Sequence, residues 1–180
     1  MEALGRWRHW PQDLTRKLTH IGAGMWVWGE LWLFDHWYWG LIPFGTFIVF
    51  NYLFWRGQVF KAMDTRESSP RTVYFAISIT LLFALLWRTD GPDWSPIAVA
   101  AVMAMTWGDA LASLVGVRWG RHLYRTFGHQ RSWEGSVAMW LCAALGILLT
   151  LRLLPGSALS PHSVPFGWGA TLLATLVGAS

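Results

Sequence analysis

The sequence predicts an all-α, polytopic integral membrane protein with about six transmembrane helices, a cytoplasmic N-terminus and a single domain over residues 1–180. Composition is the first observation, because 54% of the residues are hydrophobic and 13% are charged, whereas about a quarter of a soluble domain is charged. The second is that the apolar residues form repeated stretches close to the about 20 residues that a spanning helix needs. The third is the uneven distribution of Lys and Arg, which sets the orientation.

The apolar stretches follow one another along the whole chain. The first is short and carries Glu30, and Asp35 and His36 alone separate it from the second. A turn-rich segment, residues 155–165, is expected to connect the last two. The expected spans are residues 20–34, 37–55, 72–87, 96–116, 135–154 and 164–178.

The basic residues place the N-terminus in the cytosol. Of the 14 Lys and Arg, all but Arg88 and Arg152 precede the first span or fall in the loops 56–71 and 117–134. Basic loops stay cytoplasmic, so we expect a multi-pass protein of the cell (inner) membrane. The net charge of +4 has this simple cause, and no duplex-binding motif accompanies it, so nucleic acid is not an expected partner. One cysteine, Cys142, excludes a disulfide framework.

The fourth expected span carries a row of small residues spaced four apart. Small residues at this spacing let a second helix approach closely in lipid, and packing explains the alanines. Gly116 and Gly120 fall where the helix reaches the cytosol, so they could also admit a phosphate close to the backbone. The row comprises Ala100, Ala104, Gly108, Ala112, Gly116 and Gly120.

Three polar side chains gather where the first span begins. Arg16, Lys17 and His20 are three and four residues apart and share one helix face. Two cations and a histidine at this boundary could hold a polyphosphate. The alternative is a membrane anchor in which the histidine snorkels to the interface.

Asp109 lies inside the fourth span, two turns from its cytosolic end, with Ser113 one turn further on the same face. An aspartate in a span costs about 2.5–3.5 kcal/mol on insertion scales, which favours a functional role. Its expected partners are Mg²⁺ with a nucleotide, or the cations Arg16, Lys17 and Arg131. A salt bridge with one of those cations alone is the structural alternative.

Glu134 stands at the start of the fifth span, after Ser132, a residue type that caps helix N-termini. The free N–H groups of such a terminus attract anions. Glu134 is therefore either an ordinary first-turn acid favoured by the helix dipole or a metal ligand. In the second case it would form with Asp109 a two-carboxylate Mg²⁺ site facing a phosphate chain.

Three segments together resemble one family. RKLTHIGAG (residues 16–24) is similar to the first motif of the dolichol kinase and phytol kinase family, membrane enzymes that use CTP to phosphorylate lipid alcohols. GDALASLVGVRWGR (108–121) resembles its G-D-x-x-A-x-x-x-G-x-x-x-G segment, and RSWEGSVAMW (131–140) its K-[ST]-x-E-G-S-x-A segment. The sequence departs from the last pattern at Arg131, where the family has Lys. The resemblance also implies a longer protein, with further sequence after a sixth span.

The resemblance implies a role for each residue of a cytosolic site. Asp109 and Glu134 would hold Mg²⁺ on the phosphates of CTP, and either His20 or Asp109 would take the proton of the lipid hydroxyl. The acceptor would be phytol, geranylgeraniol or a polyprenol, with diacylglycerol next. The nucleotide-binding set would be Arg16, Lys17, Ser113, Gly116, Gly120, Arg131, Ser132, Gly135 and Ser136.

Two other functions stay open at this point. The segment around Glu134 also resembles the phosphatidate cytidylyltransferases of the same wider superfamily, although their C-terminal signature has no counterpart in this sequence. A transporter or membrane scaffold is the alternative of a different class. It would favour acids near the midplane in paired broken helices, whereas here the acids of interest gather toward one surface.

Overall fold

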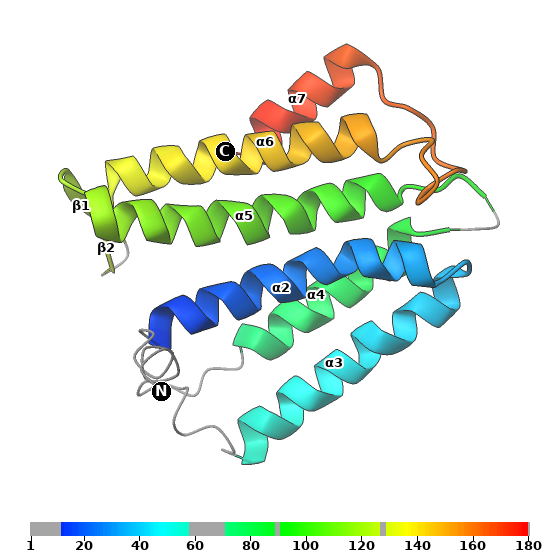
Figure 1. The fold of residues 1–180 in the computed structure, drawn as a ribbon, viewed down its shortest axis with the longest axis horizontal. Coiled ribbons are helices and arrows are strands. Elements are labelled where there is room, and N and C mark those ends of the chain that lie inside the picture. The colour runs from blue at the N-terminus through cyan, green and yellow to red at the C-terminus, as the bar shows by residue number, and fades with distance from the viewer. Residues whose placement is uncertain (1–11, 58–70, 89–90, 127–128, 180) are drawn as a thin grey trace, which may run out of the picture.

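The structure is a computed structural model that describes residues 12–57, 71–88, 91–126 and 129–179. This part of the chain is mostly helical, and Figure 1 shows its order of elements. The elements are α2 (Gln12–Leu33), α3 (Trp37–Gly57), α4 (Arg71–Leu86), α5 (Ser95–Trp119), β1 (Leu123–Thr126), β2 (His129–Ser132), α6 (Trp133–Leu153) and α7 (Trp168–Gly178).

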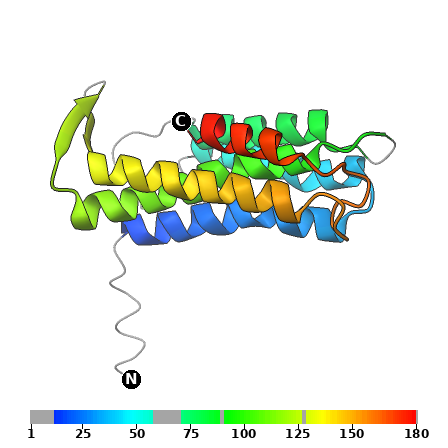
Figure 2. The same ribbon diagram turned by 90° about the horizontal axis from the view of Figure 1, so that it is seen from above.

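The helices form an elongated bundle around α5, which runs antiparallel to α2 on one side and to α6 on the other (Figures 1 and 2). Helix α7 packs on α6, and α3 packs on α4. We call the end of the bundle where α5 leads through the two strands into α6 the hairpin end, and the opposite end the loop end.

Each of the six expected spans corresponds to a helix, with boundaries that differ by a few residues except at the starts of α2 and α7. Among the described residues, α5 and α6 are long and apolar enough to cross a membrane. The apolar helices α4 and α7 have 16 and 11 residues, which at about 1.5 Å per residue gives ~24 and ~16 Å, against about 30 Å of bilayer hydrocarbon. The six-span topology and the cytoplasmic N-terminus therefore stay predictions.

The outer surface of the described helices is rich in large apolar side chains. Trp32 is 73% exposed, Leu85 70%, Leu153 67% and Val177 67%. Large exposed apolar surfaces mark contact with lipid or with another protein. The composition of the surface is thus consistent with the membrane protein expected from the sequence.

Helices α2 and α5 approach each other closely at Gly24 and Thr106. A Cβ on Gly24 would lie 2.1 Å from Thr106 Oγ1, so an alanine cannot occupy this position without movement. Toward the loop end Val27 is buried in the same core as Val99, Val102 and Met103. The glycine therefore sets how closely α2 can lie against α5.

Helices α5 and α6 pack through the predicted row of small residues. A Cβ on Gly108 would lie 3.4 Å from the Ala143 Cβ, and one on Gly135 would lie 2.9 Å from the Ala112 carbonyl oxygen. Close backbone approach of this kind is how small residues join helices in lipid. The prediction that the row receives a second helix is confirmed, and the partner is α6.

A buried carboxylate holds the loop end together. Asp93 is 7% exposed and accepts hydrogen bonds from the Ser95 backbone N–H at 2.9 Å, the Ser95 hydroxyl at 2.8 Å and the Ser160 hydroxyl at 2.6 Å. These bonds tie the start of α5 to the segment that follows α6. A buried charge persists where several donors satisfy it, which here makes Asp93 a structural residue.

Candidate functional site

The segment between α5 and α6, expected as a loop, contains an antiparallel β-hairpin. Strands β1 and β2 pair with Tyr124 opposite Arg131 and Leu123 opposite Ser132. Each strand has four residues and no alternating apolar pattern, so periodicity gave no signal for it. The hairpin delivers the chain directly into α6, because β2 ends at Ser132 and α6 begins at Trp133.

Ser132 caps α6, as the sequence predicts. Its side chain accepts a hydrogen bond from the Gly135 backbone N–H at 3.1 Å, and the Trp133 N–H donates to the His122 carbonyl oxygen at 3.0 Å. Two of the N–H groups expected to attract an anion therefore already have partners within the protein. Ser132 itself is 6% exposed, so its role in the structure is to fix where α6 starts.

Glu134 contacts the residue that precedes β1. Its Oε1 lies 2.8 Å from His122 Nδ1 and accepts a hydrogen bond from the His122 backbone N–H at 3.2 Å. The side chain of Glu134 is 28% exposed and that of His122 80%. The carboxylate thus fastens the hairpin to the first turn of α6 and stays within reach of solvent.

A second contact fastens the hairpin two residues further along each segment. The Tyr124 and Ser136 hydroxyls lie 2.6 Å apart, and the Ser136 hydroxyl donates to the Ser132 carbonyl oxygen at 3.2 Å. Tyr124 also packs its ring against Trp133, with centroids 5.3 Å apart. The side chains of Glu134 and Ser136 therefore hold the hairpin against the start of α6.

The three glycines expected to contact the nucleotide, Gly116, Gly120 and Gly135, lie where α5, the hairpin and α6 meet. A Cβ on Gly120 would lie 2.8 Å from Ser132 Oγ, and a Cβ on Gly116 would lie 3.1 Å from the same atom. A Cβ on Gly135 would lie 3.2 Å from the Gly116 Cα. Their missing side chains let α5, the hairpin and α6 converge. This packing accounts for the glycines, and their contact with a nucleotide remains a prediction.

Asp109 is exposed on α5, as are Trp107 and Leu114. It has no hydrogen-bond or ion-pair partner among the described residues, Arg131 included. The side chains of Arg16, Lys17 and His20 lie outside the described part, which places only their backbone in α2. Because α2 is antiparallel to α5 and Gly24 meets Thr106, position 20, one turn earlier in α2, is level with the turn of α5 that holds Asp109.

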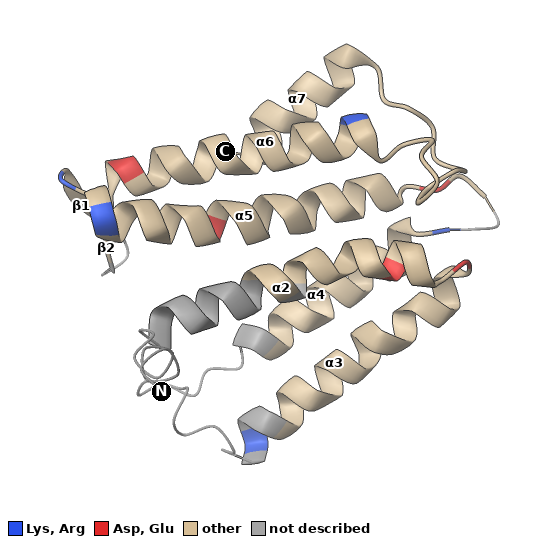
Figure 3. Cartoon of the chain, in the orientation of Figure 1, with Lys and Arg blue, Asp and Glu red and all other residues tan. Residues whose placement is uncertain are grey.

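The two carboxylates lie on neighbouring helices at different levels. Gly116 packs on Gly135, the residue after Glu134, and Asp109 precedes Gly116 by seven residues. At about 1.5 Å per residue the two levels differ by about 10 Å. Figure 3 shows one acidic turn part-way along α5 and another at the hairpin end of α6. Asp109 is the acidic residue of the α5 sequence, and Glu134 lies in the first turn of α6.

Arginines surround the hairpin end. Arg118 lies in the last turn of α5, with its guanidinium 5.6 Å from the Trp119 ring centroid, and Arg121, Arg125 and Arg131 are exposed. Exposed guanidinium groups recognise phosphate through paired N–H donors. This end of the bundle is therefore suited to a polyanion.

Sequence comparison identifies the relatives of this chain. It is 37% identical over 146 residues to a phytol kinase of Synechocystis, which covers 80% of this chain and 61% of that protein. It is 33% identical to a probable chloroplastic phytol kinase 2 of rice (78% of this chain, 48% of the relative) and 31% identical to a chloroplastic farnesol kinase of Arabidopsis thaliana (76% and 47%). The chain is a homologue of phytol and farnesol kinases.

The kinase resemblance inferred from the three motifs is thus confirmed. The chain spans about half to three fifths of the length of the relatives it matches. No protein-family model matches the sequence, and no solved structure matches it.

The carboxylates of the candidate site can be compared with the ligands that Mg²⁺ requires. No group of three or more His, Cys, Asp or Glu side chains converges within the described residues. Mg²⁺ commonly binds through one or two carboxylates together with substrate phosphates and water, at about 2.0–2.1 Å. Asp109 and Glu134 fit an ion that arrives on a nucleotide, and the difference in level requires phosphates or water between them.

Two residues that hold the hairpin against α6 were not predicted from the sequence. Neither His122 nor Tyr124 is among the predicted site residues, yet they bond the side chains of Glu134 and Ser136. Each pair is separated by twelve residues, and the hairpin that brings them together has no pattern in the sequence. Only the paired strands reveal these contacts.

Proposed function

We propose that this protein is a membrane-bound kinase that transfers the terminal phosphoryl group of a nucleoside triphosphate, CTP, to a prenyl alcohol. The observation that carries the proposal is the 37% identity to a phytol kinase over 80% of the chain. The geometry supports it, because the exposed carboxylate of Asp109 lies on α5 between the arginines of the hairpin end and the apolar part of the bundle.

The reaction forms one bond and breaks one. The alcohol oxygen attacks the γ-phosphorus, the bond from this phosphorus to the β–γ bridging oxygen breaks, and the nucleoside diphosphate leaves. The hydroxyl proton passes to Asp109 or to His20, whose backbone is level with Asp109. Phosphoryl transfer depends mainly on positioning and on stabilising negative charge.

Arginines of the hairpin end supply positive charge to balance the phosphates. Arg131, with Arg16 and Lys17 of α2, would neutralise the phosphates. Ser113 would donate a hydroxyl hydrogen bond, and the backbone at Ser136 would lie close to the nucleotide. The packed glycines Gly116, Gly120 and Gly135 and the cap Ser132 would keep the hairpin and α6 in place around the nucleotide. Asp109 and Glu134 would hold Mg²⁺, which offsets phosphate charge when bound.

Membrane placement follows from the same residues. Helices α5 and α6 would cross the bilayer, and the basic hairpin would remain on the cytosolic side. The site would then open to cytosolic nucleotide, while the alcohol would enter from the bilayer between helices. This arrangement lets a water-soluble donor and a lipid acceptor meet at one surface.

The test is a product analysis. Purified protein in detergent is incubated with Mg²⁺ and CTP, ATP, GTP or UTP, and separately with farnesol, phytol, geranylgeraniol, diacylglycerol and phosphatidate. A nucleoside diphosphate with a phosphorylated prenyl alcohol is the expected result, with CTP the best donor. Pyrophosphate with a CDP-lipid would instead identify a cytidylyltransferase, and the absence of every product would favour a non-enzymatic role.

A further inference from the structure

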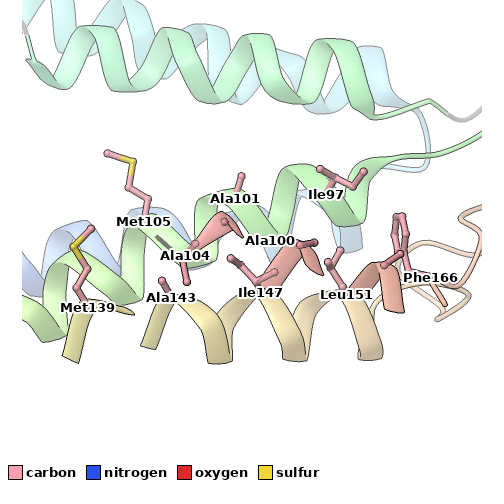
Figure 4. Close-up of a pocket in the computed structure, with 14 residues that line it drawn as sticks. Ile97, Ala100, Ala101, Ala104, Met105, Met139, Ala143, Ile147, Leu151 and Phe166 are labelled. Atoms are coloured by element: carbon pink, nitrogen blue, oxygen red, sulfur yellow. The ribbon is translucent and has the colours of Figure 1, made fainter. Parts of the chain in front are cut away.

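A groove runs along the α5–α6 pair on the side covered by α7. It has a volume of about 580 Å³, within the about 300–1,000 Å³ typical of small-molecule sites. Figure 4 shows Phe166 at one end of the groove and Met105 and Met139 at the other. Since α5 starts at the loop end, the two methionines lie toward the hairpin end.

The lining of this groove is apolar. Its α5 wall includes Ala101 and Ala104, and its α7 wall includes Ala170 and Ala174. Alanines leave room for the methyl branches of a guest, and methionine side chains adapt their shape to it. The chemistry therefore suits a branched hydrocarbon and offers nothing to a polar head group.

One row of α5 residues connects the groove to the candidate site. Ile97, Ala101 and Met105 line the groove and are spaced four apart, and the next positions in this row are Asp109 and Ser113. Residues four apart on a helix are neighbours on one face. The row thus changes from apolar to acidic one turn beyond Met105.

We propose that this groove binds the prenyl chain of the acceptor alcohol, with its hydroxyl group at Asp109. The inference rests on the proposed function, and it specifies where the substrate lies. A chain that follows the row from Ile97 to Met105 spans eight residue steps, about 12 Å of helix. Its hydroxyl then emerges at the exposed carboxylate.

A second apolar cavity offers a contrast on the other side of the α5–α6 pair. It has about 430 Å³ and is lined by Met25 and Trp28 of α2 as well as by α5 and α6. Its α5 row is Met103, Trp107 and Leu111, and the next position, four residues on, is Val115. This cavity leads to no acidic group, so we assign the prenyl chain to the groove beside α7.

Labelling tests the location directly. A farnesol analogue with a diazirine at the end of its chain is photolysed with the purified full chain, with and without excess phytol. Helix α7 lines only the first groove and α2 only the second cavity. Label on α7 that phytol competes away is the expected result; label on Met25, Trp28 or Trp107, or label that phytol leaves unchanged, would overturn the proposal.

Filling the groove gives an independent test. Ala174→Phe places a ring in the groove and should raise KM for farnesol and phytol about tenfold or more, the scale on which pockets discriminate by shape. The control is Leu173→Phe, on the same helix, where the side chain is 67% exposed and outside the groove. Equal KM values in the two variants would contradict the assignment.

The two proposals can fail separately. If the wild-type protein phosphorylates no prenyl alcohol, the proposed function is wrong, and the competed label alone decides whether the groove binds prenyl chains. If the wild-type protein is active while Leu145→Phe, which fills the second cavity, raises KM and Ala174→Phe does not, the function stands and the groove assignment is wrong.

Discussion

Two aspartates of the α5 region have opposite environments. Asp93, just before α5, is 7% exposed and accepts hydrogen bonds from Ser95 and Ser160. Asp109, within α5, is exposed and has no partner among the described residues. A carboxylate whose oxygens are all engaged by the protein holds structure together, whereas one without partners is available to a ligand. The comparison separates the residue that should govern stability from the one that should govern turnover.

Asp109→Asn should have the largest effect on activity. The change keeps the shape of the side chain and removes its charge, so the protein should fold and bind prenyl alcohol while kcat falls about 10²–10⁴-fold, the range for losing an acid–base group. Steady-state kinetics with the best alcohol, together with the melting temperature in detergent, provides the check. Full activity in this variant would remove Asp109 from the site.

Glu134→Gln should also reduce turnover, by about 10²-fold if the carboxylate helps to hold a metal-bound phosphate chain. Its contact with His122 complicates the interpretation, because Glu134 also fastens the hairpin. His122→Ala is the matched variant, since it removes the side-chain contact, keeps the backbone N–H bond to Glu134 and leaves the carboxylate. If the two variants lose equal activity, Glu134 acts by positioning the hairpin and not on the nucleotide.

Asp93→Asn should lower stability and leave turnover unchanged, the opposite of what is expected for Asp109→Asn. The amide replaces one acceptor by a donor that faces the N–H and hydroxyl groups of Ser95 and Ser160, and a buried unsatisfied group costs about 1–3 kcal/mol. The melting temperature should fall, while kcat measured on folded protein should stay near the wild-type value. The control is Asp35→Asn, an exposed acid whose loss should leave stability unchanged.

Local sequence patterns predicted the helices, the close packing of α5 and the cap of α6. The features that they did not predict depend on contacts between residues far apart in the sequence. Apolar stretches located the six helices of the described residues, and the spacing of small residues predicted that α5 would pack closely on another helix. The residue type of Ser132 predicted the cap of α6. Apolar length alone could not reveal the short α7 as one wall of a groove, and nothing local showed that His122 would meet Glu134. The role of Asp93 was hidden in the sequence because its partner Ser160 lies 67 residues away.

The close approach of α2 to α5 can be tested by adding a single methyl group. A Cβ on Gly24 would lie 2.1 Å from Thr106 Oγ1, so Gly24→Ala should push the helices apart and cost about 1–3 kcal/mol of stability. A Cβ on Gly22, in the same helix, would have nothing within 4 Å, and Gly22→Ala should stabilise the protein by about 0.5–1 kcal/mol through its higher helix propensity. Melting temperatures in detergent compare the two variants. The proposed mechanism needs α2 close to Asp109, and position 20 in α2 is one turn from Gly24, so the Gly24→Ala variant should also lower kcat. An unchanged melting temperature and kcat would mean that α2 does not set the geometry of the site.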